Sequence, residues 1–183
     1  VTLTGGTISG TGVIYTSAYH GFINPAHRGF GDGGAVTLTS TQGDITVDGA
    51  IDTSGGLPGA AGQNTNNAGD ITINSAGNFK TTATISANAG LGAIGDAGHI
   101  RITAVDDIKT VGLNSRSNLL SDAGQHAAGS ITLTGGTISG TGAITTSAYH
   151  GFINPAHRGF GDGGAVTLTS TEGDITVDGA IDT

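Results

Sequence analysis

Apolar residues alternate with threonine in short segments that recur along the chain. In residues 36–39, Val36 and Leu38 alternate with Thr37 and Thr39, a period of two that is typical of a strand with one buried face. Segments of the same kind begin at positions 1, 36, 71, 100, 131 and 166, so successive units are 29 to 35 residues apart. Periods of this length indicate a repeat architecture, in which each unit buries its apolar face against its neighbours.

Each unit continues with two more short apolar segments, which are residues 45–48 and 50–53 in the second unit. Alignment of the units gives four inward ladders of β-branched residues, leucine and one phenylalanine. The ladders are Val1, Val36, Ile71, Ile100, Ile131, Val166; Leu3, Leu38, Ile73, Ile102, Leu133, Leu168; Ile8, Ile45, Phe79, Ile108, Ile138, Ile175; and Ile14, Ile51, Ile85, Leu113, Ile144, Ile181.

The corners between these segments contain glycine and aspartate. We expect Gly43 and Gly49 to adopt a positive φ, which glycine tolerates at tight corners. The Gly-Asp pairs at Asp44, Asp70 and Asp174 are predicted to form turns in which the carboxylate bonds its own backbone.

The pattern predicts an all-β fold, a right-handed parallel β-helix (β-solenoid) with three short strands per coil, coils of 29–35 residues and one variable loop per coil. Right-handedness follows from the twist rule for parallel crossovers. A β-propeller is the alternative, because a four-stranded blade has a similar length. Each unit here offers three strands and lacks a Trp-Asp signature, which favours the solenoid.

A longer repeat contains the shorter one. Residues 1–53 recur as residues 131–183, and the two segments differ at four positions: Val1/Ile131, Val13/Ala143, Tyr15/Thr145 and Gln42/Glu172. The sequence therefore predicts a 130-residue super-repeat of four coils, complete in residues 1–130 and partial in 131–183. Since both ends fall inside the pattern, we expect residues 1–183 to form a single solenoid segment of a longer array.

Composition and charge exclude some classes of binding partner. The chain has a net charge of −8 with six scattered Lys and Arg residues, so no basic stripe is available for nucleic acid. It has no run of about 18 apolar residues, so membrane insertion is not expected. With no cysteine there is no disulfide framework, and stability must come from stacking.

Length differences between units concentrate after the third strand, in residues 19–31, 57–67, 91–96 and 117–127. The first of these loops, Tyr19–Asp32, is copied unchanged as Tyr149–Asp162, and six of the chain's eight Phe and Tyr residues lie in the two copies. The candidate contact residues are Tyr19, His20, Phe22, His27, Arg28, Phe30 and Asp32, with their equivalents Tyr149, His150, Phe152, His157, Arg158, Phe160 and Asp162.

Three interpretations of this loop are open. Phe22, Ile23, Pro25 and Phe30 could fold back as a small satellite core. The polar residues could instead face a sugar or an anion, or the two histidines and the aspartate could bind a metal ion. Residues 29–34 (GFGDGG) are similar to calcium-binding nonapeptide repeats, but the motif occurs once per super-repeat rather than in tandem. We expect no cofactor, with calcium as the alternative.

The outward threonines of the first strands form a double ladder, with pairs at Thr2/Thr4, Thr37/Thr39, Thr132/Thr134 and Thr167/Thr169. Such ladders resemble the ice-binding face of some antifreeze solenoids. Asn74 and Arg101 interrupt this one, and threonine is also a common exposed residue of strands.

An enzyme is not expected. Catalysis on such a helix needs paired carboxylates or a basic residue beside a bound metal. The pair Asp48 and Asp52, repeated as Asp178 and Asp182, has no His or Arg nearby in the sequence, and it recurs with the array.

Residues 33–56 (GGAVTLTSTQGDITVDGAIDTSGG), echoed by residues 68–79 (AGDITINSAGNF), resemble the repeats of filamentous-haemagglutinin-type exoproteins. The resemblance covers most of the chain outside the loops, although the coils here are longer than the family's. It implies a right-handed parallel β-helical rod, a location outside the cell or on its surface, and a role in adhesion, biofilm or toxin display.

We therefore expect a non-catalytic structural rod or surface fibre, part of a giant repeat protein, that self-associates end to end or laterally. The alternative is a multivalent adhesin that binds glycans or other surface ligands through the repeated Tyr19–Asp32 loop.

Overall fold

The computed structural model describes residues 1–17, 31–56, 66–90, 95–119, 127–150 and 162–183, with side chains omitted at 118, 119, 149 and 150. In these ranges, all regular secondary structure consists of β-strands. The described residues consequently include no helix that is long and apolar enough to cross a membrane.

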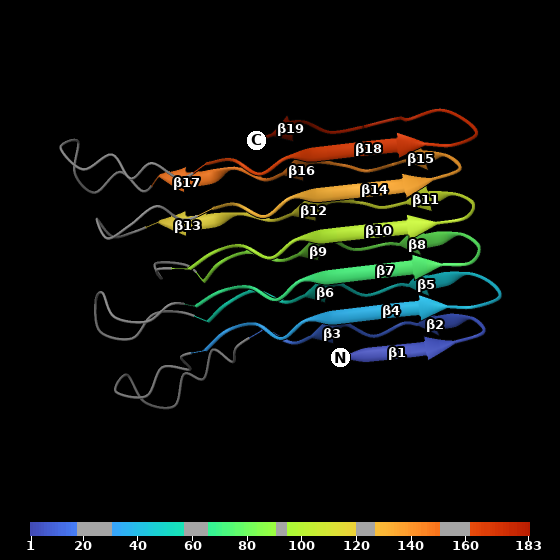
Figure 1. Ribbon diagram of the computed structural model, residues 1–183, viewed down its shortest axis with the longest axis horizontal. Helices are drawn as coiled ribbons and strands as arrows, with labels where there is room; N and C mark the ends of the chain where they lie inside the picture. Colours follow the sequence, from blue (N-terminus) through green and yellow to red (C-terminus); the bar gives the residue numbers. More distant parts are fainter. Residues whose placement is uncertain (18–30, 57–65, 91–94, 120–126, 151–161) are drawn as a thin grey trace.

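The chain winds into a parallel β-solenoid with three sheets (Figure 1). It runs along a front sheet, returns behind it through two shorter strands, and rises towards the C-terminus, which makes the coil right-handed. All strand pairs are parallel and join neighbouring coils, as predicted. The prediction of three short strands per coil is confirmed.

The first sheet, sheet A, contains the first strand of each coil. Its strands are β1 (Thr2–Gly5), β4 (Val36–Ser40), β7 (Ile71–Ser75), β10 (Ile100–Ala104), β14 (Ile131–Gly135) and β18 (Val166–Ser170). Sheet B contains β2 (Ile8–Gly10), β5 (Ile45–Val47), β8 (Phe79–Thr81), β11 (Ile108–Lys109) and β15 (Ile138–Ser139). Sheet C contains β3 (Ile14–Tyr15), β6 (Ile51–Asp52), β9 (Ile85–Ser86), β12 (Leu113–Asn114), β16 (Ile144–Thr145) and β19 (Ile181–Asp182).

The register confirms the apolar ladders. Leu38 lies between Leu3 and Ile73 in sheet A, and Phe79 lies between Ile45 and Ile108 in sheet B. The other predicted rungs are also neighbours, including the isolated bridge that extends the sheet B ladder at its C-terminal end. The two-residue alternation of the sequence therefore sets which face of every strand is buried.

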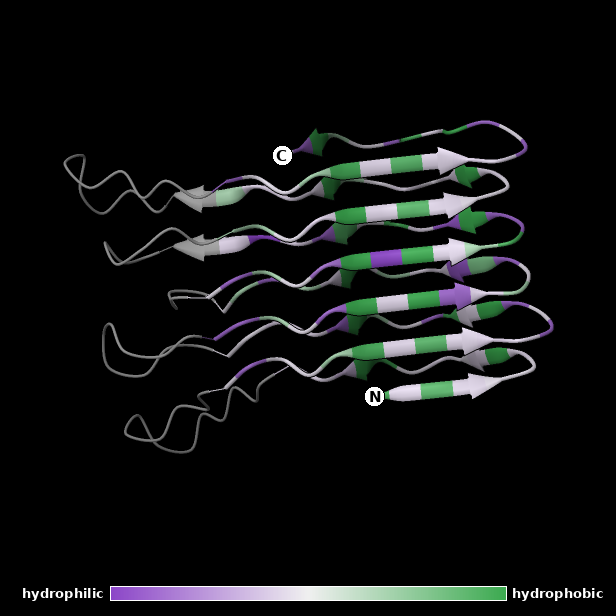
Figure 2. Ribbon diagram, in the orientation of Figure 1, coloured by the Kyte–Doolittle hydropathy of each residue, from purple (hydrophilic) through white to green (hydrophobic). Residues whose placement is uncertain are grey.

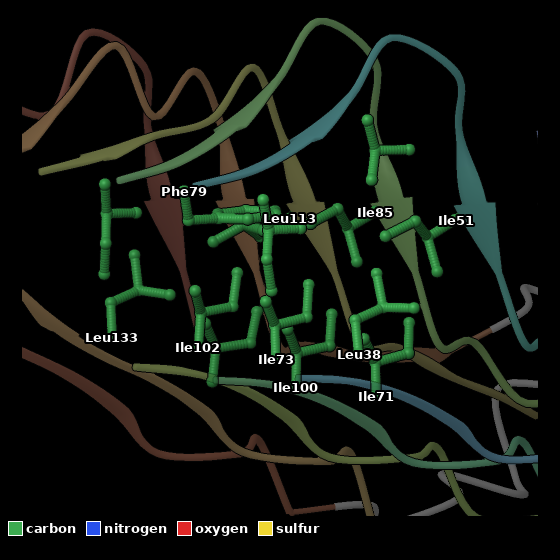
Figure 3. Close-up of a cluster of buried hydrophobic side chains, with 14 of the residues drawn as sticks. Leu38, Ile51, Ile71, Ile73, Phe79, Ile85, Ile100, Ile102, Leu113 and Leu133 are labelled. Atoms are coloured by element: carbon green, nitrogen blue, oxygen red, sulfur yellow. The ribbon is translucent and has the colours of Figure 1, made fainter. Parts of the chain in front are cut away.

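The core is one continuous column of aliphatic side chains with a single phenylalanine. Figure 3 shows side chains of sheet A, such as Ile73 and Ile102, pointing towards Phe79 and Leu113 across the interior. Figure 2 shows the matching alternation of green and pale bands along the front strands. Rungs in the first and last coils contact a neighbour on one side, so Leu3 is 44% exposed and Ile181 is 50% exposed, whereas Leu38 is fully buried.

The expectation of a positive φ at Gly43 and Gly49 is wrong. Among the described residues, the left-handed glycines include Gly140 (φ 57°) and Gly142 (φ 55°), and neither predicted corner is one of them. Close approach explains the corner glycines instead, because a Cβ on Gly49 would lie 2.2 Å from the Gly12 carbonyl oxygen of the coil below.

The predicted Gly-Asp turns are also corrected. The Asp44 carboxylate accepts a hydrogen bond from the Asn78 amide of the next coil (2.7 Å), and the Asp70 carboxylate accepts one from the His99 amide (2.8 Å). Asn78 Oδ1 in turn accepts from the Asp107 amide (3.1 Å). These side chains bond the coil above rather than their own turn, because stacking places its N–H groups within reach.

A fourth, two-stranded sheet was not predicted. It pairs β13 (Ser117–Leu119) with β17 (Ala148–His150) where the chain leaves sheet C towards the variable loops. Its strands lack the alternating apolar pattern of the other sheets, so the pattern of apolar residues did not predict them.

Candidate functional site

Most of the predicted contact residues lie outside the described residues. These are Tyr19, His20, Phe22, His27, Arg28, Phe30, Phe152, His157, Arg158 and Phe160. Tyr149 and His150 belong to β17, where the backbone alone is described. Asp32 and Asp162 are described and exposed, and both lie where a loop returns to the coil.

Asp32 begins a column of side-chain acceptors at this return point. Its carboxylate accepts from the Asn67 amide (2.8 Å), Asn67 Oδ1 accepts from the Asp96 amide (2.9 Å), and the Asp96 carboxylate accepts from the Ala127 amide (3.1 Å). Asp162 joins the same corner through its backbone carbonyl, which accepts from the Ala128 amide (3.1 Å). One oxygen of Asp32 is thus engaged in holding coils together.

A threonine hydroxyl closes the base of three of the loops. The residue after the third strand donates its hydroxyl to a glycine carbonyl two residues before the next first strand. Thr53 Oγ1 donates to the Gly69 carbonyl (2.6 Å), and Thr146 Oγ1 donates to the Gly164 carbonyl (2.6 Å). The same glycine donates its amide back to the threonine carbonyl, at 2.9 Å for Gly69 and 2.8 Å for Gly164. Thr16 and Gly34 make the same pair of bonds.

One coil lacks its own hydroxyl at this position. Ala87 follows the third strand of the coil that begins at Ile71, and its carbonyl accepts the Gly98 amide (2.9 Å). The Gly98 carbonyl is instead bonded by Ser115 Oγ from the next coil (2.6 Å). Thr or Ser follows five of the six third strands, and Gly lies two residues before every first strand after β1; this recurrence is the sequence signal that could have revealed these clamps.

The clamp glycines stack in a column along the solenoid. A Cβ on Gly98 would lie 2.2 Å from the Gly69 carbonyl oxygen, and one on Gly164 would lie 2.1 Å from the Gly129 carbonyl oxygen. Real Cβ atoms do not approach this closely, so any side chain here would separate the coils. The loop bases are therefore fixed in one line along the edge between sheets C and A.

The outer face of sheet A is almost free of charge. Its outward residues are Thr2, Thr4, Thr37, Thr39, Thr72, Asn74, Arg101, Thr103, Thr132, Thr134, Thr167 and Thr169. The register places Asn74 between Thr39 and Thr103, and Arg101 between Thr72 and Thr132, so both interrupt the threonine ladder as the sequence predicted.

The outer face of sheet B is charged in bands. We call this surface the sheet B face and define it by Thr46, Lys80, Lys109 and Ser139 on the strands, with Asp44, Asp48, Asp107, Asp174 and Asp178 beside them. Lys80 and Lys109 are direct register partners, and both side chains are exposed. Like charges opposite each other on neighbouring strands are destabilising.

The described residues include one ion pair. Arg116 lies 3.8 Å from the Asp182 carboxylate two coils above, and the two side chains are 44% and 57% exposed. Such an exposed pair adds little to stability. Asp52 Oδ1 accepts hydrogen bonds from the Ser54 amide (2.9 Å) and the Ser54 hydroxyl (2.5 Å).

Within the described ranges, no cluster of three or more His, Cys, Asp or Glu residues could hold a metal ion. The arrangement offers extended, repeated surfaces: a neutral threonine face, a banded sheet B face and a line of anchored loop bases. No protein-family model, curated protein or solved structure matches the chain significantly.

Proposed function

We propose that the chain is a non-catalytic segment of a structural rod, part of a long repeat protein. The observation that carries the proposal is the unbroken core, in which each apolar ladder continues from coil to coil in register. A solenoid of this kind is quasi-one-dimensional, so adding coils lengthens it without changing its cross-section.

The spacing of the super-repeat sets the scale of such a rod. Neighbouring strands lie about 4.8 Å apart, so four coils advance the rod by roughly 19 Å per 130 residues. Side-chain columns through Asp44 and Asn78 and through Asp32 and Asn67 add bonds between coils at two corners. Stiffness along the axis is the property that this arrangement favours.

We place the rod outside the cell or on its surface, as a fibre segment related to filamentous-haemagglutinin-type exoproteins. Support comes from the resemblance of residues 33–56 and 68–79 to the repeats of that family. A fold that stacks without a cysteine framework is compatible with this location and does not depend on it.

The test measures length. The 183-residue chain is compared with a chain lengthened by one 130-residue unit, a copy of residues 54–183 appended at the C-terminus. Single-particle electron microscopy should show an increase of roughly 19 Å along the coil axis, the vertical direction of Figure 1, with unchanged dimensions across it. An increase in cross-section, or a compact particle, contradicts the rod.

Adhesion through the repeated loop is the second candidate function. The clamps at Thr16/Gly34 and Thr146/Gly164 lie in one line, so two identical loops leave the same edge of the rod four coils apart. Loops repeated on one rod could combine weak contacts through effective concentration. A glycan array probed with the multivalent, lengthened chain tests this function, and binding no stronger than that of an Arg28→Ala, Arg158→Ala variant contradicts it.

A further inference from the structure

The described cations are confined to two neighbouring coils of the solenoid. The described Lys and Arg residues, which are Lys80, Arg101, Lys109 and Arg116, all lie between residues 71 and 130. In the described residues between 71 and 130, these four cations are accompanied by Asp96, Asp106 and Asp107, so this part of the chain is close to neutral. It lies between two acidic stretches: residues 31–70 have five aspartates and no cation, and residues 162–183 have four aspartates, one glutamate and no cation.

The sheet B face shows this uneven distribution of charge most directly. The coil through β5 presents Asp44 and Asp48, and the next coil presents Lys80. The coil through β11 presents Lys109 with Asp107 beside it, and the following coil presents neutral Ser139. Two aspartates, Asp174 and Asp178, then return in the last coil.

Lys80 is left without a charged partner in its own rod. Its register neighbours are Thr46 and Lys109, and among the described residues it has no ion pair or hydrogen bond. Lys109 and Asp178 both lie near Gly140, because a Cβ on Gly140 would be 3.7 Å from Lys109 Cε and 3.8 Å from the Asp178 carboxylate. Lys80 is the exposed cation of this face that needs a partner from outside.

We propose that the sheet B face is a lateral contact between two copies of the rod, packed antiparallel. A two-fold axis that passes between β5 and β8 places Asp44 and Asp48 of each copy opposite Lys80 of the other. Because the axis is two-fold, the same contact between the two aspartates and Lys80 forms twice, once on each side of the axis. The inference rests on the proposed rod and specifies which face assembles it.

Charge complementarity favours this face over the others. The sheet A face offers a single cation, Arg101, and no carboxylate to receive it. On the side of sheet C, Arg116 is already directed to Asp182 in its own rod. In a chain of net charge −8, the sheet B face is where two copies can meet with opposite charges aligned.

The area of the contact makes association depend on length. The axis between β5 and β8 overlaps four coils of each copy, and five residues across by four coil spacings give roughly 300 Å² per rod, or about 600 Å² for both, below the 1,200–2,000 Å² of stable interfaces. In the lengthened chain, an axis two coils further along overlaps eight coils and again places Lys80 opposite a pair of aspartates, Asp174 and Asp178, which brings the total to about 1,300 Å². The 183-residue chain should therefore pair weakly, and the lengthened chain should pair measurably.

Sedimentation velocity at about 20 mM and about 500 mM NaCl tests the proposal on both chains. We expect the lengthened chain to dimerise at low salt and to lose at least about tenfold in affinity at high salt. Lys80→Glu, made in each unit, should weaken dimerisation at least about tenfold. The matched control is Arg101→Glu, which makes the same charge change on the sheet A face and should leave the dimer intact.

A mixing experiment distinguishes face pairing from net charge. A Lys80→Glu chain and a chain with Asp48→Lys and Asp178→Lys should each fail to self-associate, and an equimolar mixture should form a heterodimer. Equal loss with Arg101→Glu, or no heterodimer in the mixture, overturns the proposal. So does binding of heparin through Lys80 and Lys109 without self-association, since the partner would then be a polyanion.

Failure of this inference is distinguishable from failure of the proposed rod. A lengthened chain that gains roughly 19 Å but stays monomeric at low salt overturns the lateral contact and leaves the rod standing. A lengthened chain that does not gain this length overturns both.

Discussion

The stacked glycines of the loop edge are the point at which a single methyl group should break the rod. In Gly98→Ala, the new Cβ would lie 2.2 Å from the Gly69 carbonyl oxygen, 2.7 Å from the Gly69 carbonyl carbon and 3.3 Å from Ala87 Cβ. Ordinary contacts begin at 3.4 Å, so the two coils must separate by about 1.2 Å. Gly98 cannot move outward alone, because its amide bonds Ala87 and its carbonyl accepts Ser115 Oγ.

The cost has two parts. Overpacking of this kind costs typically 1–3 kcal/mol. Separation also stretches the neighbouring bond from the Ile71 amide to the His99 carbonyl (2.8 Å), and one such bond contributes about 0.5–1.5 kcal/mol. We therefore expect Gly98→Ala to lower the free energy of unfolding by about 2–4 kcal/mol.

Urea unfolding followed by circular dichroism measures the loss, and amide hydrogen exchange locates it. Protection of the Ile71 amide should fall more than that of Ile102, which lies within sheet A away from the substituted corner. The matched control is Gly112→Ala in the next coil, where the nearest atom to a Cβ is Thr84 Oγ1 at 3.4 Å. The reasoning is refuted if Gly98→Ala stays within about 0.5 kcal/mol of the wild type, or if Gly112→Ala is equally destabilising.

Three further substitutions probe the core and the coil-to-coil bonds. Thr53→Val removes a buried hydroxyl that donates to a carbonyl and should lower the free energy of unfolding by about 1–3 kcal/mol, whereas the outward Thr39→Val should change it by less than about 0.5 kcal/mol. Equal urea midpoints for the two variants contradict this prediction. Phe79→Ala should cost about 3–5 kcal/mol, and Phe79→Ile, which restores the aliphatic side chain found elsewhere in the ladder, under about 1.5; a reversed order in thermal unfolding contradicts the assigned core position. Asp70→Ala should cost about 0.5–1.5 kcal/mol and accelerate exchange of the His99 amide, and an unchanged amide counts against the bond.

The sequence predicted the interior better than the corners. Alternation alone placed Leu38, Ile73 and Phe79 on the inward face and paired them correctly, because a period of two leaves one register in which all apolar residues are buried. Local rules did not predict the corners. Gly49 is required by the carbonyl of Gly12 in the coil below, a contact 37 residues distant in the chain that no turn rule contains.

The same reason explains the aspartates and the unpredicted strand pair. Asp44 has an amide of the next coil within 2.7 Å, a partner that exists only once the coils are stacked. β13 and β17 pair because their loops leave adjacent coils at the same edge, not because their side chains alternate. Of the candidate loop, the return point at Asp32 is described, and its role as a coil-to-coil acceptor was not anticipated.

The hydrogen bond from Ser115 to the Gly98 carbonyl of the previous coil has a consequence for the evolution of the gene. Since Ser115 supplies the bond that Ala87 cannot make, the coil that begins at Ile71 depends on the coil that follows it. Unequal recombination between the coding segments for residues 1–53 and 131–183, whose products differ at four positions, adds or deletes 130 residues and keeps these two coils together. Natural alleles of the gene should accordingly differ in length by multiples of 130 codons, and alleles that gain or lose one coil should be rare.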